Sequence, residues 1–104
     1  LGDVYKRQNE NRKDTHMFRL MGSIYKDTHI LKSTVICDDT KDSRTQKVFH
    51  SLDSICHKFD LPSPIWLDAN VKDFQKFSKV RFSQDNFIEI LDFDYFEIQI
   101  IEED

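Results

Sequence analysis

The sequence predicts a small α+β domain: a two-layer sandwich with the element order β-β-α-β-α-β, in which two helices cover one face of a small mixed sheet. Three patterns lead to this fold class. Apolar and polar side chains alternate over residues 18–25 and 95–101, an apolar stripe at helical period occupies residues 48–59, and two prolines separate that stripe from a shorter helical pattern. With 104 residues, 38% of them hydrophobic, the chain can bury one core.

The first part of the predicted sheet is a β-hairpin. After the alternating residues 18–25, the polar residues 26–29 supply a turn. Residues 30–37 form the second strand, because they are rich in the β-branched side chains that suit a pleated surface. A run of polar residues from Asp38 to Asp42 ends this strand.

A helix is predicted to begin near Ser43, since Ser43 and Gln46 have the spacing of a capping box. Pro62 and Pro64 end it, because proline cannot donate to the helical ladder and restricts the residue before it. One apolar face of this helix should lie against the sheet: Val48, Phe49, Leu52, Ile55, Cys56 and Phe59.

The second half of the chain contains the remaining strands and the second helix. Residues 65–67 are predicted to be a short buried strand, and Asp68 is placed to cap a helix with one apolar face. Residues 79–92 fit either an extended segment or a single helical turn capped by Asp85, and the pattern favours the turn. Alternation over residues 95–101 predicts the last strand. The apolar face of the second helix consists of Val71, Phe74 and Phe77.

Residues 1–16 are expected to lie outside the domain, which we place at residues 17–104. They are polar, lack periodicity, and have the pattern of neither a signal peptide nor a transit peptide. Residues 3–8 resemble the translation of a transposon end used to prepare sequencing libraries, so we expect a non-native segment and a natural start at Met17. The alternative is a disordered native tail. No apolar run approaches the roughly 18 residues of a membrane span, and we expect a cytoplasmic protein.

Charge is unevenly placed along this acidic chain, whose net charge is −4. Nucleic acid is a disfavoured partner, because phosphate binding needs a basic surface. Residues 40–81 hold eight basic and five acidic side chains, whereas residues 82–104 hold eight acidic side chains and no Lys or Arg. Either these charges are solvated or paired within one fold, or they form complementary surfaces for self-association.

The junction at residues 66–70 has the composition of a ligand site. A buried strand there runs into a helix whose free N–H groups can hold an anion or a polar ligand. If nearby polar residues converge on it, they offer a stacking surface, a cation, carboxylates and amides. The alternative places Trp66 in the core and uses Asp68 and Asp85 as caps. The candidate ligand-binding residues are Trp66, Asp68, Asn70, Arg81, Asp85 and Asn86.

A weaker metal-site candidate is formed by His50, Asp53 and His57, on the helix face opposite the apolar stripe. Neighbouring pairs can share a divalent cation, but the two histidines are separated by roughly 10 Å along the axis. The alternative is a solvated helix face. Cys37 and Cys56 lack the C-x-x-C spacing of zinc or redox sites, and we expect both to be reduced thiols. The sequence predicts no cofactor and no catalytic residue.

Three segments, Thr34–Asp39, Pro64–Asp68 and Gln84–Glu89, resemble a group of short, uncharacterised bacterial proteins. The resemblance spans nearly all of residues 17–104 and implies a bacterial, cytosolic protein, without an activity or a cofactor. The small size, the lack of catalytic motifs and the split between a basic middle and an acidic end favour a non-enzymatic protein-interaction module that binds another protein or a second copy of itself. The alternative is a small ligand- or metal-binding domain that uses the junction at residues 66–70 together with Arg81.

Overall fold

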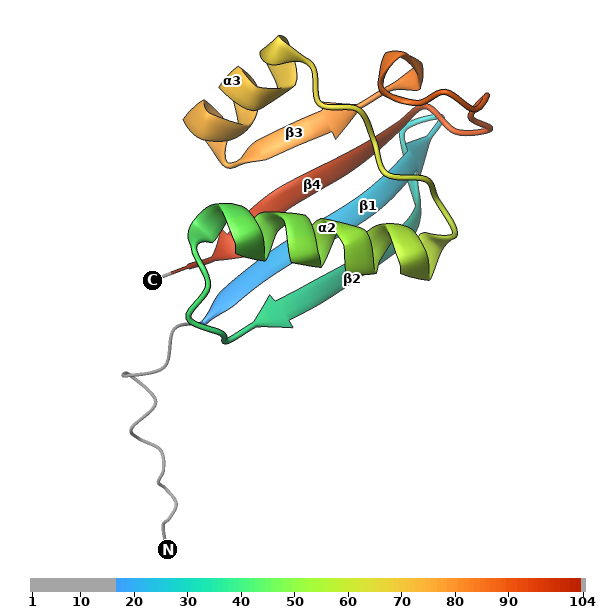
Figure 1. Ribbon diagram of the computed structural model, residues 1–104. Helices are drawn as coiled ribbons and strands as arrows, with labels where there is room; N and C mark the ends of the chain where they lie inside the picture. Colours follow the sequence, from blue (N-terminus) through green and yellow to red (C-terminus); the bar gives the residue numbers. More distant parts are fainter. Residues whose placement is uncertain (1–16, 104) are drawn as a thin grey trace, which may run out of the picture.

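The computed structural model describes residues 17–103, which form a four-stranded sheet with two helices on one face (Figure 1). The strand order across the sheet is β2-β1-β4-β3. The predicted α+β class is thus confirmed, and the expected tail at residues 1–16 lies outside the described residues. The elements in chain order are β1 (Phe18–Lys26), β2 (His29–Asp38), α2 (Arg44–Phe59), α3 (Asp68–Phe77), β3 (Lys79–Phe82), the 3₁₀ turn η2 (Gln84–Asn86) and β4 (Tyr95–Glu102).

The third strand is not where the sequence predicts it. Residues 65–67 have no regular secondary structure, and β3 lies instead at Lys79–Phe82. The single turn predicted near Asp85 is present as η2, directly after this strand. The backbone of Ile65 pairs with a turn rather than with a strand, since its N–H donates to the carbonyl of Asn86 at 2.7 Å. Because β3 follows α3 directly and pairs with β4, the sheet is antiparallel throughout rather than mixed.

Helix α2 begins and ends as its sequence predicts. The hydroxyl of Ser43 accepts a hydrogen bond from the N–H of Gln46 at 3.2 Å, and Asp60 closes the helix in the left-handed conformation. The predicted apolar face is buried with one exception. Phe49 remains 48% exposed, because it lies on the flank of the helix that faces α3 rather than the sheet.

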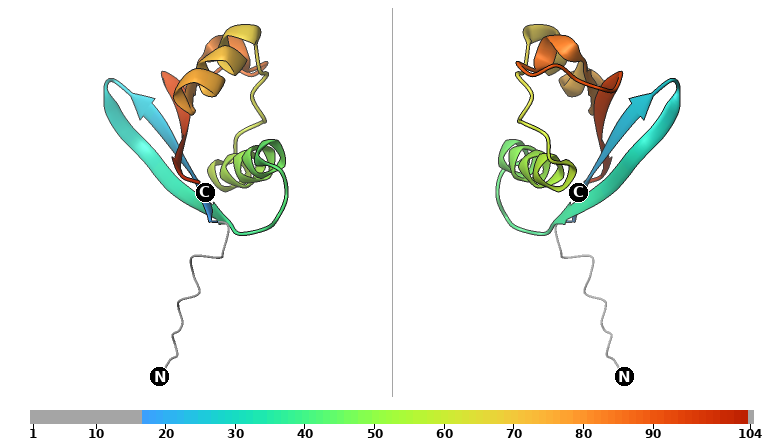
Figure 2. Two further views of the ribbon diagram at one scale, coloured as in Figure 1. Left: turned by 90° about the vertical axis from the view of Figure 1, so that its left-hand side faces the viewer. Right: turned by 90° about the vertical axis from the view of Figure 1, so that its right-hand side faces the viewer.

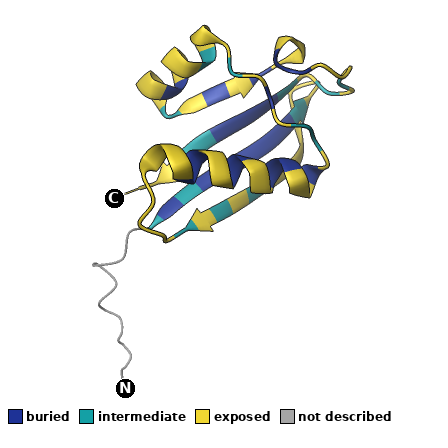
Figure 3. Cartoon of the chain, in the orientation of Figure 1, coloured by how far each residue is buried: buried dark blue, intermediate teal, exposed yellow. Residues whose placement is uncertain are grey.

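The core lies between the sheet and α2, and Figure 3 shows the buried positions on the facing sides of these two layers. Its members come from every strand except the edge strand β2, whose Ile36 is only partly buried. Helix α3 contributes little, because Phe74 is its one buried residue. The most deeply buried large side chains are Phe18, Phe82, Phe96, Leu20, Ile55 and Ile98.

Gly22 lets α2 approach the middle of β1. A Cβ atom at this position would lie 2.6 Å from Cγ2 of Ile55 and 3.2 Å from Cε1 of Phe96. Both neighbours are fully buried and cannot withdraw into solvent. We therefore expect Gly22→Ala to lower the free energy of unfolding by about 1 to 3 kcal/mol, measured by urea denaturation.

The pairing of Gly22 with Ile55 can be tested directly by a double-mutant cycle. Ile55→Ala removes the atoms that the new methyl group would meet, so the double variant Gly22→Ala/Ile55→Ala should be more stable than the sum of the two single effects predicts. Additive losses would contradict the close approach of α2 to β1.

The opposite face of the sheet is not covered by either helix (Figure 2). Its own side chains cover it instead. The rings of Tyr25 and Tyr95 stack with centroids 4.8 Å apart, and the guanidinium of Arg81 lies 4.6 Å from the Tyr95 centroid. Arg81 also donates to the buried carboxylate of Glu97 at 3.2 Å. The Tyr95 ring is thus in contact with both Tyr25 and Arg81, so it is not free to stack on a ligand.

No helix within residues 17–103 has the length and apolar character needed to cross a membrane.

Candidate functional site

Two of the candidate ligand residues, Asn70 and Asn86, are brought together by the structure. The amide nitrogen of Asn86 donates to the side-chain oxygen of Asn70 and to the carbonyl of Ile65, both at 2.7 Å. Each asparagine also reaches back three residues, to accept from the N–H of Leu67 and of Ser83 respectively, both at 2.9 Å. The amides therefore bind one another and the backbone, which leaves little of their hydrogen-bonding capacity for a ligand.

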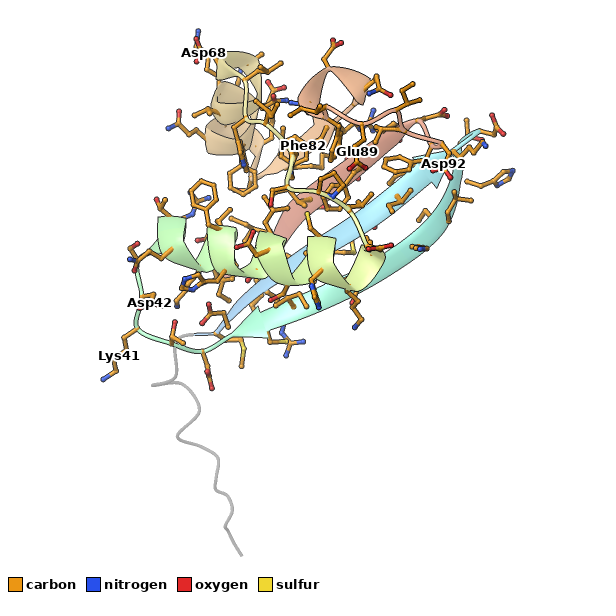
Figure 4. The ribbon with its side chains drawn as sticks, turned by 45° about the vertical axis from the view of Figure 1, so that its right-hand side comes forward. Lys41, Asp42, Asp68, Phe82, Glu89 and Asp92 are labelled. Atoms are coloured by element: carbon orange, nitrogen blue, oxygen red, sulfur yellow. The ribbon has the colours of Figure 1, made fainter. Side chains whose placement is uncertain are left out.

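Asp68 and Asp85 do not cap their helical segments, because the N-cap positions are Leu67 and Ser83, whose N–H groups donate to Asn70 and Asn86. Both carboxylates are exposed, and Figure 4 shows Asp68 pointing away from the body of the molecule at the start of α3. Arg81 lies between Val80 and Phe82, whose side chains are buried under the helices, so its own side chain is on the opposite face of the sheet. The structure therefore does not bring Arg81 and Asp68 together.

The metal-site candidates are also separate. His50 lies 3.7 Å from a carboxylate oxygen of Asp42, and Asp53 accepts a hydrogen bond from the hydroxyl of Ser63 at 3.4 Å. All three candidates, including His57, are exposed on α2. Within the described range 17–103, no three His, Cys, Asp or Glu side chains form a group that could hold a metal ion. The geometry gives no support to a metal site at His50, Asp53 and His57.

The thiol of Cys56 lies beside His57 and Asp53 at an open surface hollow on α2. Burial, together with the nearby negative charge of Asp53, raises the pKa of Cys56 to about 12. The thiol is therefore protonated at neutral pH, which makes it a poor nucleophile. Cys37 is exposed on β2, and neither cysteine forms a disulfide bond.

Trp66, the remaining candidate, lines an apolar groove between α2 and α3. The groove has a volume of about 320 Å³. The indole packs edge-on against Phe49 and Phe74, with ring centroids 6.0 and 5.6 Å away. Phe49 and Val71 remain 48% and 39% exposed at its mouth. The lining residues are Arg44, Thr45, Val48, Phe49, Trp66, Val71, Phe74 and Gln75.

One end of the groove is cationic. The guanidinium of Arg44 lies 5.7 Å from the centroid of the Phe74 ring and donates to the carboxylate of Glu103 at 3.0 Å. A second hydrogen bond joins Arg44 to the hydroxyl of Ser78 at 3.4 Å. These contacts hold the first turn of α2 against the end of α3 and place a positive charge beside an apolar surface.

A second surface feature was not predicted from the sequence. We call residues 87–91, between η2 and β4, the isoleucine loop. Its two isoleucines, Ile88 and Ile90, are 90% and 93% exposed, more than any other large apolar side chain described. The side chain of Gln84 holds the loop, since its nitrogen donates to the carbonyl of Glu89 at 2.7 Å and its oxygen accepts from the N–H of Leu91 at 2.8 Å.

The isoleucine loop is surrounded by carboxylates. Asp85 and Asp92 flank it and Glu89 separates the two isoleucines; Figure 4 labels Glu89 and Asp92 on this part of the chain. None of the ion pairs between described residues includes these three side chains. The signal that could have found this surface is the absence of Lys and Arg from residues 82–104.

Some of the basic side chains of residues 40–81 form ion pairs with acidic side chains of residues 82–104 within the fold. Arg44 pairs with Glu103 at 3.0 Å and Arg81 pairs with Glu97 at 3.2 Å, so two ion pairs join the basic middle of the chain to its acidic end. The acidic groups left over are therefore concentrated around the isoleucine loop.

No known protein family, curated protein or solved structure matches this chain. Its function is therefore proposed from the two surfaces described above.

Proposed function

We propose that this protein is a non-enzymatic interaction module whose groove between α2 and α3 binds an apolar, acidic segment of a protein. The observation that carries the proposal is the groove itself, where Phe49 and Val71 stand half-exposed beside Trp66. Burying one aliphatic side chain there is worth about 1.5 to 3 kcal/mol, so two anchor residues suffice for a weak, specific contact.

The lining of the groove favours a protein segment over a small polar ligand. Arg44 is the only charged residue among its lining side chains, and that guanidinium is already paired with Glu103. The amides of Asn70 and Asn86, which a polar ligand at the neighbouring junction would need, are bonded to each other and to the backbone. The groove can therefore bind a partner mainly through apolar contacts.

The charge of the surrounding surface favours an acidic segment. The part of the chain that forms α2, α3 and β3, residues 40–81, has three more basic than acidic side chains. Arg44 and Arg81 are paired with Glu103 and Glu97, which leaves six basic and five acidic side chains. This small excess gives a weak attraction for a negatively charged segment during encounter.

The state of the buried thiol of Cys56 is consistent with a non-enzymatic module. The thiol of Cys56 has a neighbouring histidine in the sequence, yet its raised pKa keeps it protonated at neutral pH.

The proposal is tested by the fluorescence of Trp66, the only tryptophan in the chain and a wall of the groove. A synthetic acidic apolar peptide, DLELLD, is expected to change this fluorescence in a saturable way. The same peptide with lysine in place of its carboxylates, or with serine in place of its leucines, should bind at least about tenfold more weakly.

A pair of valine variants supplies the matched control. Val71→Glu places a carboxylate in the groove and should abolish binding, whereas Val35→Glu makes the same change at a valine on the uncovered face of the sheet. The two valines are 39% and 40% exposed, so the folded chain should tolerate both changes similarly. Equal binding by wild type and Val71→Glu, or a preference for the lysine peptide, would refute the proposed function.

A further inference from the structure

We infer that the segment bound by the groove is the isoleucine loop of a second copy of this chain, so that copies associate head to tail. This inference rests on the proposed function and gives it a specific partner. It follows from the form, the charge and the position of the isoleucine loop.

The form of the loop suits insertion into a groove. Ile88 and Ile90 project into solvent, while Phe87 is buried and Leu91 packs against the core on either side of them. Gln84 holds the backbone of the loop through two hydrogen bonds of 2.7 and 2.8 Å. Little conformational entropy is therefore lost when the loop binds, and the exposed apolar surface of both isoleucines leaves water.

The charges of the two surfaces are complementary. The loop carries Glu89 and is flanked by Asp85 and Asp92, in a part of the chain without Lys or Arg. The groove has Arg44 at one end, where Glu103 of the same copy already pairs with it, and lies on a part of the chain that has a small excess of basic side chains. Ion pairs within one copy use only part of this asymmetry, so the remaining carboxylates around the loop can face the basic surface of another copy.

The position of the loop prevents it from filling the groove of its own chain. The groove is lined by residues of α3 and of the half of α2 that begins at Arg44. In Figure 1 the segment between η2 and β4 lies away from these parts, beside the turn of the β1–β2 hairpin. The N–H of Asp27 in that turn donates to the carboxylate of Asp94 at 2.9 Å, which fixes the segment there. Occupation of the groove by this loop must therefore be intermolecular.

Two different surfaces of the same chain then meet, which is a heterologous contact. After one contact forms, one copy still has a free groove and the other a free loop, so further copies can add until a ring closes. The contact is small, and the association should be weak and concentration-dependent.

The inference is tested by analytical ultracentrifugation of the 104-residue chain over a range of concentrations. The mass should rise above that of the 12.5 kDa monomer with concentration, and should fall again as salt screens the charges. The loop variant Ile88→Ser/Ile90→Ser and the groove variant Val71→Glu should each raise the apparent dissociation constant by at least about tenfold. Val35→Ser, a change outside both surfaces, should associate like wild type.

Mixing the two defective variants is the decisive step. The loop variant has an intact groove and the groove variant has an intact loop, so their mixture should form a complex of two chains and nothing larger. An interface between identical patches cannot be rescued in this way. Failure of the mixture to associate, while wild type does, would overturn the inference.

A second measurement separates this inference from the proposed function. If wild type is monomeric at every concentration but DLELLD still changes the fluorescence of Trp66, the groove binds a segment of another protein and the second copy is excluded. A peptide of residues 84–92, QDNFIEILD, tests the same contact without any variant that could fail to fold. It should bind the wild-type protein and compete with self-association. No binding of that peptide would also overturn the inference.

Discussion

Replacing Phe82 by alanine is expected to lower the free energy of unfolding by about 3 to 5 kcal/mol, a large part of the total stability of so small a domain. Phe82 is fully buried at the point where β3, β4 and the groove meet. Its ring packs edge-on against Trp66 at 5.0 Å and lies 6.0 Å from the ring of Phe96. Urea denaturation followed by circular dichroism measures the loss.

Phe77→Ala provides the control for this prediction. Phe77 is also a phenylalanine near the end of α3, but it is exposed and contacts little beyond the ammonium group of Lys76, 5.3 Å from its ring centroid. Its loss should cost less than about 1 kcal/mol. Similar costs for Phe77→Ala and Phe82→Ala would mean that β3 does not pack under Trp66.

The hairpin, α2 and β4 could be predicted from the sequence because each has a long periodic pattern. Helix α2 also has a local start signal at Ser43 and a proline stop. Strand β3 has neither a long periodic pattern nor a local start or stop signal. A pattern of only four residues is too short to distinguish a strand from part of a turn. The strand conformation is set by long-range pairing of Val80 with Ile98 and of Phe82 with Phe96.

The apolar tripeptide at residues 65–67 shows the opposite error. Its composition is that of a buried strand, but it follows two prolines, the backbone of Ile65 bonds to Asn86 in a turn, and the side chains of Ile65 and Leu67 are exposed. Trp66 then uses its apolar surface to line the groove. Composition alone cannot show whether an apolar segment is buried by a sheet or by side chains from two helices.

The candidate site could be predicted only in part. Sequence reasoning selected Trp66, Asn70 and Asn86 as site residues, but it could not show that two amides 16 positions apart bind each other. It also passed over Ile88 and Ile90, because apolar residues that alternate with charged ones are normally half-buried. The loop backbone between the buried Phe87 and the partly buried Leu91 is held by the side chain of Gln84, a contact that the local pattern of residues 87–91 does not show.

The hydrogen bonds of Asn86 connect the two features on which the proposed function depends. They join the segment before α3, which carries Trp66, to the turn before the isoleucine loop. The groove wall and the loop are thus anchored to one buried side chain, which explains why the polar residues of this region have a structural role.

Asn86→Ala is accordingly expected to lower the free energy of unfolding by about 2 to 4 kcal/mol, since it leaves the N–H of Ser83 and the carbonyl of Ile65 without partners. The exposed neighbour Asp85→Ala should change it by less than about 0.5 kcal/mol. Urea denaturation with Trp66 fluorescence measures both. Equal effects at the two positions would contradict the buried amide network.

Asn86→Asp tests the direction of the hydrogen bonds in the same network. The introduced carboxyl faces the carbonyl of Ile65 and the side-chain oxygen of Asn70, which accept from the native amide at 2.7 Å. Burial and these oxygens raise the pKa of the new carboxyl in the folded state above its unfolded value. The stability that the protonated carboxyl contributes is therefore lost as pH rises through the folded-state pKa. The difference in free energy of unfolding between wild type and Asn86→Asp should widen between about pH 4 and about pH 7. A gap independent of pH would mean that residue 86 is hydrated and that the groove and the loop are not joined through it.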